Sequence, residues 1–307
     1  MRKTILTQVF DLAKKDERVL FIGSDLGSGT LDEFRQQIPE RFFMEAISEA
    51  NVIGMATGFA LDGKIPYVNT IATFLTRRSF EQVVIDVGLH NARVRMIGNG
   101  GGLVYGPLGP THVATDDIGI LRTIPNMTIV APADAREMCR LMPQTLEYPG
   151  PIYIRLAKGG DPLVTPEAGA YEIGRAVPMR NGRDALIVTT GTTLQIALEA
   201  AKVLTADGID AAILHMPTIK PLDTEKLLES VHIVRVVATI EEHSLIGGLG
   251  SAVAETLVDH NVIPKAGLIR IGIPDQFIDT YGSQSEIMNK FGINVDGLVA
   301  RIRNRLG

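Results

Sequence analysis

The segment Arg41-Phe42-Phe43-Met44-Glu45-Ala46-Ile47-Ser48-Glu49-Ala50-Asn51 changes from an apolar run to a stretch of helix-forming residues. A short apolar run predicts a buried strand, and a serine followed by an acidic residue is typical of a helix start. The segment therefore predicts a strand that passes directly into a helix beginning at Glu49. In a parallel α/β sheet, such strand-to-helix turns lie at the edge where ligands bind.

The same alternation extends in both directions from this segment and predicts an α/β protein in which two domains each have a mainly parallel sheet flanked by helices. The predicted strands are Val19–Ser24, Phe42–Ile47, Ile65–Thr70, Val94–Gly98, Met127–Val130, Ile152–Leu156, Ala185–Thr190, Ala211–His215, Val234–Ile240 and Leu268–Ile271. The predicted helices are Leu6–Lys14, Glu49–Leu61, Ser79–Leu89, Asp116–Arg122, Asp134–Leu146, Thr193–Ala206, Thr224–Ser230, Gly250–Asp259, Glu286–Phe291 and Val295–Leu306.

A break in this pattern separates the two halves of the chain. Between Gly159 and Gly182, turn residues follow one another without a helical or strand period. Such a stretch is typical of a surface connection between domains. We therefore expect domains over residues 1–165 and 183–307, with residues 166–182 as the linker.

Composition narrows the possible functions. The chain has 307 residues, of which 45% are hydrophobic and 21% are charged, and these values fit a globular protein rather than a disordered one. With 30 basic and 35 acidic residues the formal charge is 30 − 35 = −5, so the chain has no strongly basic field for nucleic acid. A single cysteine, Cys139, excludes an internal disulfide framework and a multi-cysteine metal site.

The N-terminus argues against export and membrane insertion. Gln8, Asp11, Lys14 and Lys15 interrupt any apolar core of a signal peptide. No apolar run in the sequence approaches the roughly 20 residues of a membrane span. We therefore expect a soluble, cytoplasmic protein that does not bind membranes.

Glu49 has two interpretations. An acidic residue in the first turn of a helix is favoured by the helix dipole alone. However, apolar neighbours surround Glu49 in the sequence, so we expect burial to raise its pKa and fit it for proton exchange with a ring nitrogen.

A second candidate region follows the predicted strand Val94–Gly98. The segment Gly98-Asn99-Gly100-Gly101-Gly102-Leu103-Val104-Tyr105-Gly106-Pro107-Leu108-Gly109-Pro110-Thr111-His112 has a bare backbone that can approach a ligand closely. It matches neither the dinucleotide-binding nor the P-loop glycine pattern. His112, at its end, is either a surface residue or a group that transfers protons.

Aromatic and basic residues follow two further strands. Phe74 and Phe80 fit ordinary core residues. Alternatively, the Phe74 ring stacks on a flat heterocycle. Arg77 and Arg78 are expected to pair with acidic residues such as Asp25, Asp32 or Glu81, or to meet a partner chain. Two basic residues, Arg155 and Lys158, lie at the end of Ile152–Leu156. They either bind a substrate phosphate or are simply solvated side chains at a strand end.

The segment Glu241-Glu242-His243-Ser244-Leu245-Ile246-Gly247-Gly248-Leu249-Gly250-Ser251 lies between a predicted strand and a predicted helix. Its glycines permit close packing of the strand on the helix, and the helix N-terminus is able to hold an anion. No cluster in the sequence has zinc or calcium spacing, so we expect no metal ligand in this chain.

Taken together, these segments resemble the C-terminal half of the transketolase family of thiamine-diphosphate enzymes. The same pattern occurs in 1-deoxyxylulose-5-phosphate synthases and in the β subunits of 2-oxo acid dehydrogenases. The resemblance covers nearly the whole chain through Ser24-Asp25-Leu26, Ile47-Ser48-Glu49, Thr73-Phe74-Leu75, Gly109-Pro110-Thr111-His112, Pro125-Asn126-Met127, Ala131-Pro132-Ala133-Asp134, Glu242-His243-Ser244 and Gly247-Gly248-Leu249-Gly250-Ser251.

The resemblance implies a pyrimidine-binding domain followed by the family's C-terminal domain. It implies that Glu49 hydrogen-bonds N1′ of the cofactor's aminopyrimidine, which favours the 4′-imino tautomer that takes the proton from thiazolium C2. Phe74, with Phe80 beside it, would contact the ring, and Asp25 would face the cofactor across a subunit interface. His112 would contact substrate and assist proton transfer.

The phosphate site of the substrate is implied in the same way. Lys158 falls where transketolases carry a basic phosphate-binding residue, and Arg155 lies beside it in the sequence.

The chain lacks the Gly-Asp-Gly motif with which the family binds the diphosphate and a divalent metal. The resemblance therefore implies a split transketolase, in which a separate N-terminal subunit carries this motif and the magnesium ion. Two copies of each chain would form a heterotetramer that is active only as a complex.

The expected reaction is transfer of a two-carbon ketol unit between ketose and aldose sugars, with phosphorylated sugars as the expected substrates. Pro107 and Leu108 stand where transketolases often have an acidic pair, and Gly100 stands where a further histidine is found, so the sugar is left open. Two alternatives remain: a β subunit of a 2-oxo acid dehydrogenase or related decarboxylating synthase, and a non-catalytic subunit that stabilises or regulates its partner.

Overall fold

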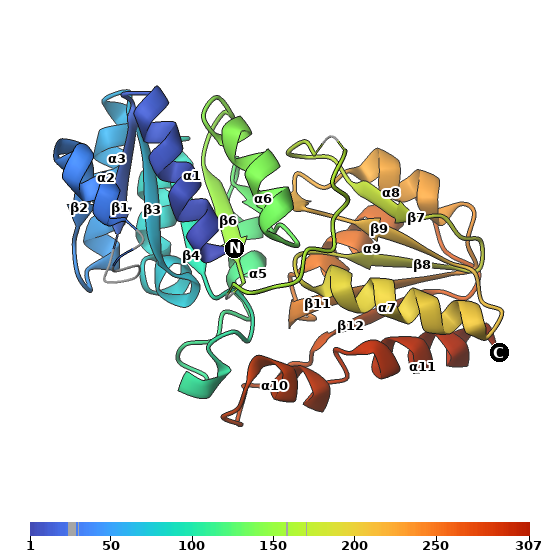
Figure 1. Ribbon diagram of the computed structural model, residues 1–307. Coiled ribbons are helices and arrows are strands. Elements are labelled where there is room, and N and C mark those ends of the chain that lie inside the picture. The colour runs from blue at the N-terminus through green and yellow to red at the C-terminus, as the bar shows by residue number, and fades with distance from the viewer. Residues whose placement is uncertain (24–28, 30, 158, 170) are drawn as a thin grey trace.

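The computed structural model describes residues 1–23, 29, 31–157, 159–169 and 171–307 (Figure 1). Two α/β units follow one another along the chain, each with a central sheet between layers of helices (Figure 1). None of the helices in these residues combines the length and the apolar character that a bilayer crossing requires.

The first sheet has the strand order β10-β5-β6-β4-β3-β1-β2. All neighbouring strands are parallel except β10, which runs antiparallel to β5. Its strands are β1 (Val19–Gly23), β2 (Phe42–Met44), β3 (Ile65–Ile71), β4 (Arg95–Asn99), β5 (Thr128–Val130), β6 (Ile152–Leu156) and β10 (Thr218–Lys220). Because β1, β3, β4 and β6 run parallel, their carboxyl ends lie along the same side of the sheet.

Helices cover both faces of this sheet. α1 and α6 pack apolar side chains such as Val9, Phe10 and Leu141 on one face, and α3, η3 and α5 pack side chains such as Ile53 and Val87 on the other. The helical segments of this half are α1 (Arg2–Lys15), α2 (Asp32–Gln37), η1 (Pro39–Arg41), α3 (Glu49–Leu61), η2 (Phe74–Arg78), α4 (Phe80–Gln82), η3 (Val83–Leu89), η4 (Gly106–Leu108), α5 (Asp117–Arg122), α6 (Ala135–Leu141) and η5 (Met142–Thr145). The segments η2 and η3 are π-helical.

The second sheet has the order β12-β11-β8-β9-β7, and only β7 runs antiparallel to its neighbour. Helices α7 and α11 pack on one face, and α8 and α9 on the other. The elements are β7 (Val177–Arg180), β8 (Ala185–Thr189), α7 (Thr193–Ala206), β9 (Ala211–His215), α8 (Thr224–Val231), β11 (Val236–Ser244), α9 (Leu249–Asp259), β12 (Leu268–Ile273), α10 (Gln284–Lys290) and α11 (Val295–Leu306).

The predicted fold class is confirmed, and the differences are confined to particular elements. The predicted strand Phe42–Ile47 ends at Met44, and the predicted helix Ser79–Leu89 is mostly π-helical. The sequence did not predict α2, β7 or β10. β7 lies within the segment predicted as a linker, and β10 returns from the second half of the chain to the edge of the first sheet.

Candidate active site

Three predicted site residues follow the carboxyl ends of strands in the first sheet. Glu49 begins α3 after β2, Phe74 begins η2 after β3, and His112 lies in the loop after β4. These strands occupy neighbouring or nearby places in the order β4-β3-β1-β2. The fold thereby brings side chains that are far apart in the sequence to the same edge of the sheet.

Glu49 is a buried carboxylate with a single charged partner among the described residues. Its side chain is 4% exposed, and Arg78 donates a hydrogen bond from Nη1 to its Oε2 at 2.8 Å. Ser48, which the sequence predicts as the helix cap, instead donates its hydroxyl to the carbonyl oxygen of Glu45. The predicted burial of Glu49 is confirmed, whereas its ion pair with Arg78 was not predicted.

Arg78 also covers the ring of Phe74. Its guanidinium carbon lies 3.9 Å from the centre of that ring, within the range of a cation–π contact. Both residues belong to the π-helical segment η2, where a spacing of four residues places their side chains on the same side. Glu49, Phe74 and Arg78 therefore form one cluster, which we call the Glu49 cluster.

His112 lies beside this cluster. Its ring meets the Phe74 ring edge-on, with 5.2 Å between ring centres and 70° between planes. The hydroxyl of Thr73, just before η2, donates to the carbonyl oxygen of Val113 at 2.7 Å, and this bond connects the start of η2 to the His112 loop. The Thr111 hydroxyl lies 2.9 Å from His112 Nδ1, so the tautomer of the imidazole depends on which of the two donates.

The Glu49 cluster borders an open hollow of about 490 Å³. Thr73, Phe74, Arg77, Arg78, Pro110, Thr111 and Phe277 line it. Phe277 comes from the second half of the chain and is 89% exposed. Both halves thus contribute side chains to the opening, which leads from the Glu49 cluster to the surface.

A second hollow continues across the junction of the two halves. It has a volume of about 310 Å³, and Arg77, Pro110, Asp116 and Phe277 are among its lining residues. Arg77 pairs with Asp116 at 3.6 Å. Burial raises the pKa of Asp116, and the Arg77 guanidinium partly offsets this effect. The pKa of Asp116 at this opening is therefore raised above its ordinary value.

The Glu49 cluster fits the aminopyrimidine ring that the resemblance implies. A flat guanidinium already lies over the Phe74 ring and presents an N–H to Glu49, so this space accepts a planar group with an N–H donor. Glu49 and Phe74 would hold such a ring by a hydrogen bond and by stacking. His112, whose ring touches Phe74, would lie next to it.

Arg155, which the sequence predicts as a substrate-phosphate ligand, lies at the junction of the two halves. Its side chain is buried, and it donates from Nε to Asp117 at 2.8 Å and from Nη2 to the carbonyl oxygens of Ala114 and Glu242. Burial alone would lower the pKa of Arg155, but the adjacent Asp117 carboxylate raises it above its ordinary value. Arg155 therefore joins the first half of the chain to β11, and its Nε and Nη2 atoms donate within the protein.

The glycine run after β4 also serves this junction. A Cβ atom on Gly101 would lie 2.5 Å from the Arg155 side chain, and one on Gly102 would lie 2.5 Å from the Glu242 carboxyl group. Gly102 in addition has a φ of +69°. The bare backbone thus makes room for side chains of the same chain, whereas the sequence suggested room for a ligand.

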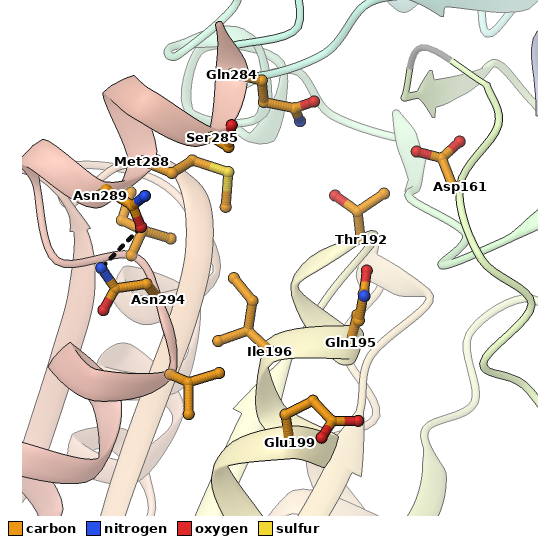
Figure 2. Close-up of a pocket in the computed structure, with 12 residues that line it drawn as sticks. Asp161, Thr192, Gln195, Ile196, Glu199, Gln284, Ser285, Met288, Asn289 and Asn294 are labelled. Carbon is orange, nitrogen blue, oxygen red and sulfur yellow. Dashed lines mark hydrogen bonds between the residues drawn. The ribbon is translucent and has the colours of Figure 1, made fainter.

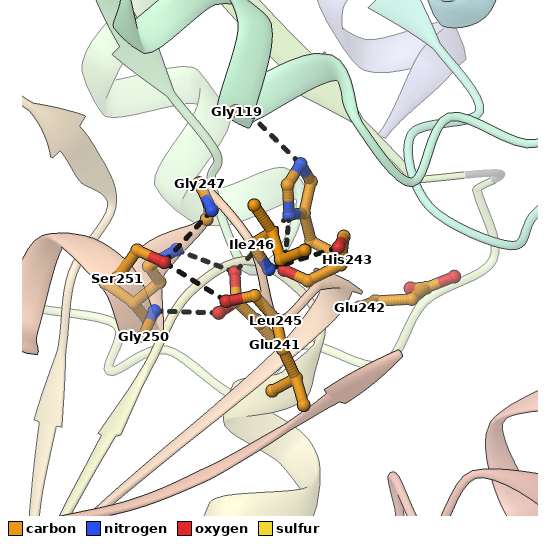
Figure 3. Close-up of polar contacts among 12 residues, drawn as sticks. Gly119, Glu241, Glu242, His243, Leu245, Ile246, Gly247, Gly250 and Ser251 are labelled. Atoms are coloured by element: carbon orange, nitrogen blue, oxygen red, sulfur yellow. Dashed lines mark hydrogen bonds and ion pairs between the residues drawn. The ribbon is translucent and has the colours of Figure 1, made fainter. Parts of the chain in front are cut away.

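Figure 3 shows how the polar residues at the end of β11 are used. The carboxylate of Glu241 accepts the backbone N–H groups of Leu249 and Gly250, both at 2.7 Å, at the start of α9. The backbone N–H of Gly119 donates to His243 Nε2 at 3.2 Å. The anion at this helix N-terminus is therefore Glu241 itself, and burial raises its pKa.

The remaining predicted site residues are Phe80, Asp25 and Lys158. Phe80 packs against the core on the α3 side of the first sheet, and it is not among the described residues that line the hollow. Its ring fits the core interpretation. Asp25 and Lys158 lie outside the described residues. Sequence reasoning missed the role of Arg78, although its position four residues after Phe74 is a usable signal.

Figure 2 shows a further hollow between α7 and α10, with a volume of about 330 Å³. Its lining includes Thr192, Gln195, Glu199 and Gln284. It has no lining residue in common with the hollow beside the Glu49 cluster. None of the predicted site residues that the structure describes lines the hollow between α7 and α10, whereas Phe74 lines the hollow beside the Glu49 cluster.

Comparison with known protein families matches both halves of the chain. Residues 1–160 match the family model described as the transketolase pyrimidine binding domain. Residues 174–298 match the model described as the transketolase C-terminal domain.

Similar proteins include subunits of transketolases. A 6-deoxy-6-sulfo-D-fructose transketolase subunit from Clostridium sp. is 35% identical over 97% of this chain and 92% of that protein. A subunit of an apulose-4-phosphate transketolase from Phocaeicola vulgatus is 35% identical over 97% of this chain and 94% of that protein. A solved structure described as a split gene transketolase, inactive beta4 tetramer, has a TM-score of 0.91 and 34% identity, over 99% of this chain and 97% of that one.

Proposed function

This chain belongs to the transketolase family and corresponds to the C-terminal subunit of its split members, and we propose that it transfers a two-carbon ketol unit between sugars. The proposed cofactor is thiamine diphosphate, and the proposed substrates are a ketose and an aldose, at least one of them phosphorylated. The names of the similar subunits include a sugar phosphate and a sulfonated sugar, which supports a small acidic sugar as the substrate class.

The observation that carries this proposal is the geometry of the Glu49 cluster. A carboxylate that is 4% exposed lies next to an aromatic ring, and both contact the same flat N–H donor. A buried carboxylate beside an aromatic ring is what a proton-exchanging nitrogen heterocycle requires. The cluster also opens onto a hollow that is large enough for a sugar phosphate.

In the proposed mechanism, Glu49 holds and exchanges a proton at N1′ of the bound aminopyrimidine. Phe74 orients that ring by stacking on it. His112, held next to Phe74 by its loop, donates and accepts protons at substrate oxygens. When bound, the cofactor supplies the nucleophilic carbon and the electron sink for ketol transfer.

The partner subunit has a defined part in this proposal. The sequence of this chain contains no Gly-Asp-Gly motif. We propose that a separate N-terminal subunit supplies that motif, and with it the diphosphate and magnesium site, in a heterotetramer with two copies of each chain. Lys158 is proposed to bind the substrate phosphate, Asp25 to face the cofactor at the interface between subunits, and the complex to work in the cytoplasm.

Co-expression with a subunit that carries the Gly-Asp-Gly motif tests the proposal. Ketol transfer from a phosphorylated ketose to an aldose should be measured for the complex and for each chain alone. We expect turnover from the complex only, without release of carbon dioxide. Full turnover by this chain alone would refute the split arrangement. Release of carbon dioxide from a 2-oxo acid would identify a decarboxylating enzyme instead.

A further inference from the structure

Arg78 makes two contacts that a bound heterocycle would also make. It donates an N–H to Glu49 at 2.8 Å, and its guanidinium lies 3.9 Å from the centre of the Phe74 ring. A guanidinium is planar, delocalised and rich in N–H donors, so it stacks on an aromatic ring much as a protonated aminoheterocycle does. Both groups therefore require the same space between the same two side chains.

The charge of Glu49 explains why this space is filled. A carboxylate that is 4% exposed and has no partner would carry a large desolvation cost. Arg78 supplies the compensating charge in the free chain. Any ring that takes over the hydrogen bond to Glu49 must displace Arg78 from it, or share the one carboxylate with it.

Arg78 is able to leave without disrupting the fold. Its side chain is 45% exposed, and Glu49 and Phe74 are the partners of its guanidinium among the described residues. The neighbouring Arg77 instead forms an ion pair with Asp116 and donates a hydrogen bond to the carbonyl oxygen of Thr111. The π-helical turn therefore has one arginine free to exchange its contacts and one that holds the His112 loop.

We propose that Arg78 is a placeholder for the aminopyrimidine. In the free subunit it occupies the ring position on Glu49 and Phe74, and cofactor binding displaces its guanidinium into the adjacent hollow. Arg78 thereby keeps Glu49 charge-compensated before assembly and lowers the apparent affinity for cofactor. This inference rests on the proposed function, because it takes the Glu49 cluster to be the pyrimidine site.

Calorimetric titration of thiamine diphosphate with magnesium into the assembled complex tests this placeholder role. Arg78→Met removes the competing guanidinium while keeping the length of the side chain. We expect the dissociation constant of the cofactor to fall about tenfold, because the ring no longer competes with a charge-assisted hydrogen bond. We also expect the free Arg78→Met chain to melt at a lower temperature, because Glu49 is then buried without its partner.

Arg140→Met is the matched control. Arg140 also stacks on an aromatic ring, with 4.9 Å between its guanidinium carbon and the centre of the Tyr171 ring, and it lies outside the hollow. The control makes the same change of charge and should leave the dissociation constant within about twofold of the wild-type value.

The outcomes separate this inference from the proposed function. If the wild-type complex binds cofactor and Glu49→Gln weakens that binding, the pyrimidine site is supported. An unchanged or increased dissociation constant for Arg78→Met would then overturn the placeholder role alone. If the wild-type complex binds no cofactor, the proposed function and the placeholder role are both refuted.

Discussion

Two buried charges in this chain are compensated in different ways. The Arg155 guanidinium is held by Asp117 and two backbone carbonyl oxygens, and one of these, that of Glu242, belongs to the other half of the chain. The Glu49 carboxylate is held by one arginine whose side chain is 45% exposed. A buried charge with a single replaceable partner is suited to exchange that partner for a ligand, whereas Arg155 is suited to fix the architecture.

Substitution of Arg155 tests this distinction. Arg155→Met leaves Asp117 buried without its ion-pair partner, and breaking such a pair costs about 3–5 kcal/mol in the free energy of unfolding. We expect a clearly lower melting temperature and, at temperatures where the variant stays folded, an unchanged KM for phosphorylated sugars. A large increase in that KM with unchanged stability would instead support Arg155 as a phosphate ligand.

The sequence predicted which residues belong to the candidate site better than it predicted their contact partners. Glu49, Phe74 and His112 were singled out because each follows a strand, and the structure places them at one edge of the first sheet. The partner of Arg78 could not be predicted, because it lies 29 residues away and is brought close only by the packing of α3 against η2. The contacts of Arg155 could not be predicted for the same reason, because its partners come from distant segments.

At the scale of elements, one carboxylate organises the start of α6. Asp134 accepts the backbone N–H groups of Arg136 and Glu137 at 2.9 Å, which confirms the predicted helix start. It also accepts those of Val164 and Thr165 at 2.7 Å, from the segment that leaves the first half of the chain. A single side chain therefore fixes both a helix end and the path of the connection.

Removing this carboxylate should destabilise the fold measurably. Asp134→Ala loses a helix cap worth about 1–2 kcal/mol and leaves further backbone N–H groups without an acceptor. We expect a larger loss of unfolding free energy in urea than for Asp223→Ala, which removes a cap that accepts one N–H from α8 and one from Ala176. An equal or smaller loss would show that the bonds to Val164 and Thr165 contribute nothing.

The contribution of Asp134 should also depend on pH. Burial alone would raise the pKa of Asp134, but the N–H groups that it accepts lower it below the usual 3.8. Because the folded state holds the lower pKa, the stabilisation is complete above the usual value and is lost as the pH falls through the folded value. The stability difference between wild type and Asp134→Ala should therefore be constant near pH 7 and shrink below about pH 4. A difference that grows on acidification would contradict this assignment.

The sequence predicted elements with a clear pattern well and the shortest edge strands poorly. The bounds of α3, α7, α11, β6 and β9 agree with the predicted ranges, because each has a clear period or a continuous apolar run. β7 and β10 are edge strands of four and three residues that contain or adjoin proline, so they carry no detectable period. β11 extends to Ser244 because its polar end is buried by contacts with the first half, which no local pattern reveals.

For the whole molecule, the two halves are joined by polar contacts rather than by a simple linker. β10 pairs with β5, Arg155 reaches β11, and the N–H of Leu103 donates to Glu242. These contacts place Phe277 beside the opening that Thr73 and Thr111 line. The hollow is thus formed by both halves of the chain together.

The most direct test of the proposed role of Glu49 compares Glu49→Gln with wild type in the complex reconstituted with the Gly-Asp-Gly subunit. Glutamine keeps the shape of the side chain but removes the group that exchanges a proton. We predict that the variant assembles normally and that its ketol-transfer kcat falls by about 10²-fold or more. The exposed control Glu40→Gln should retain wild-type turnover. Wild-type turnover by the Glu49→Gln complex would contradict a proton-exchanging role for this carboxylate.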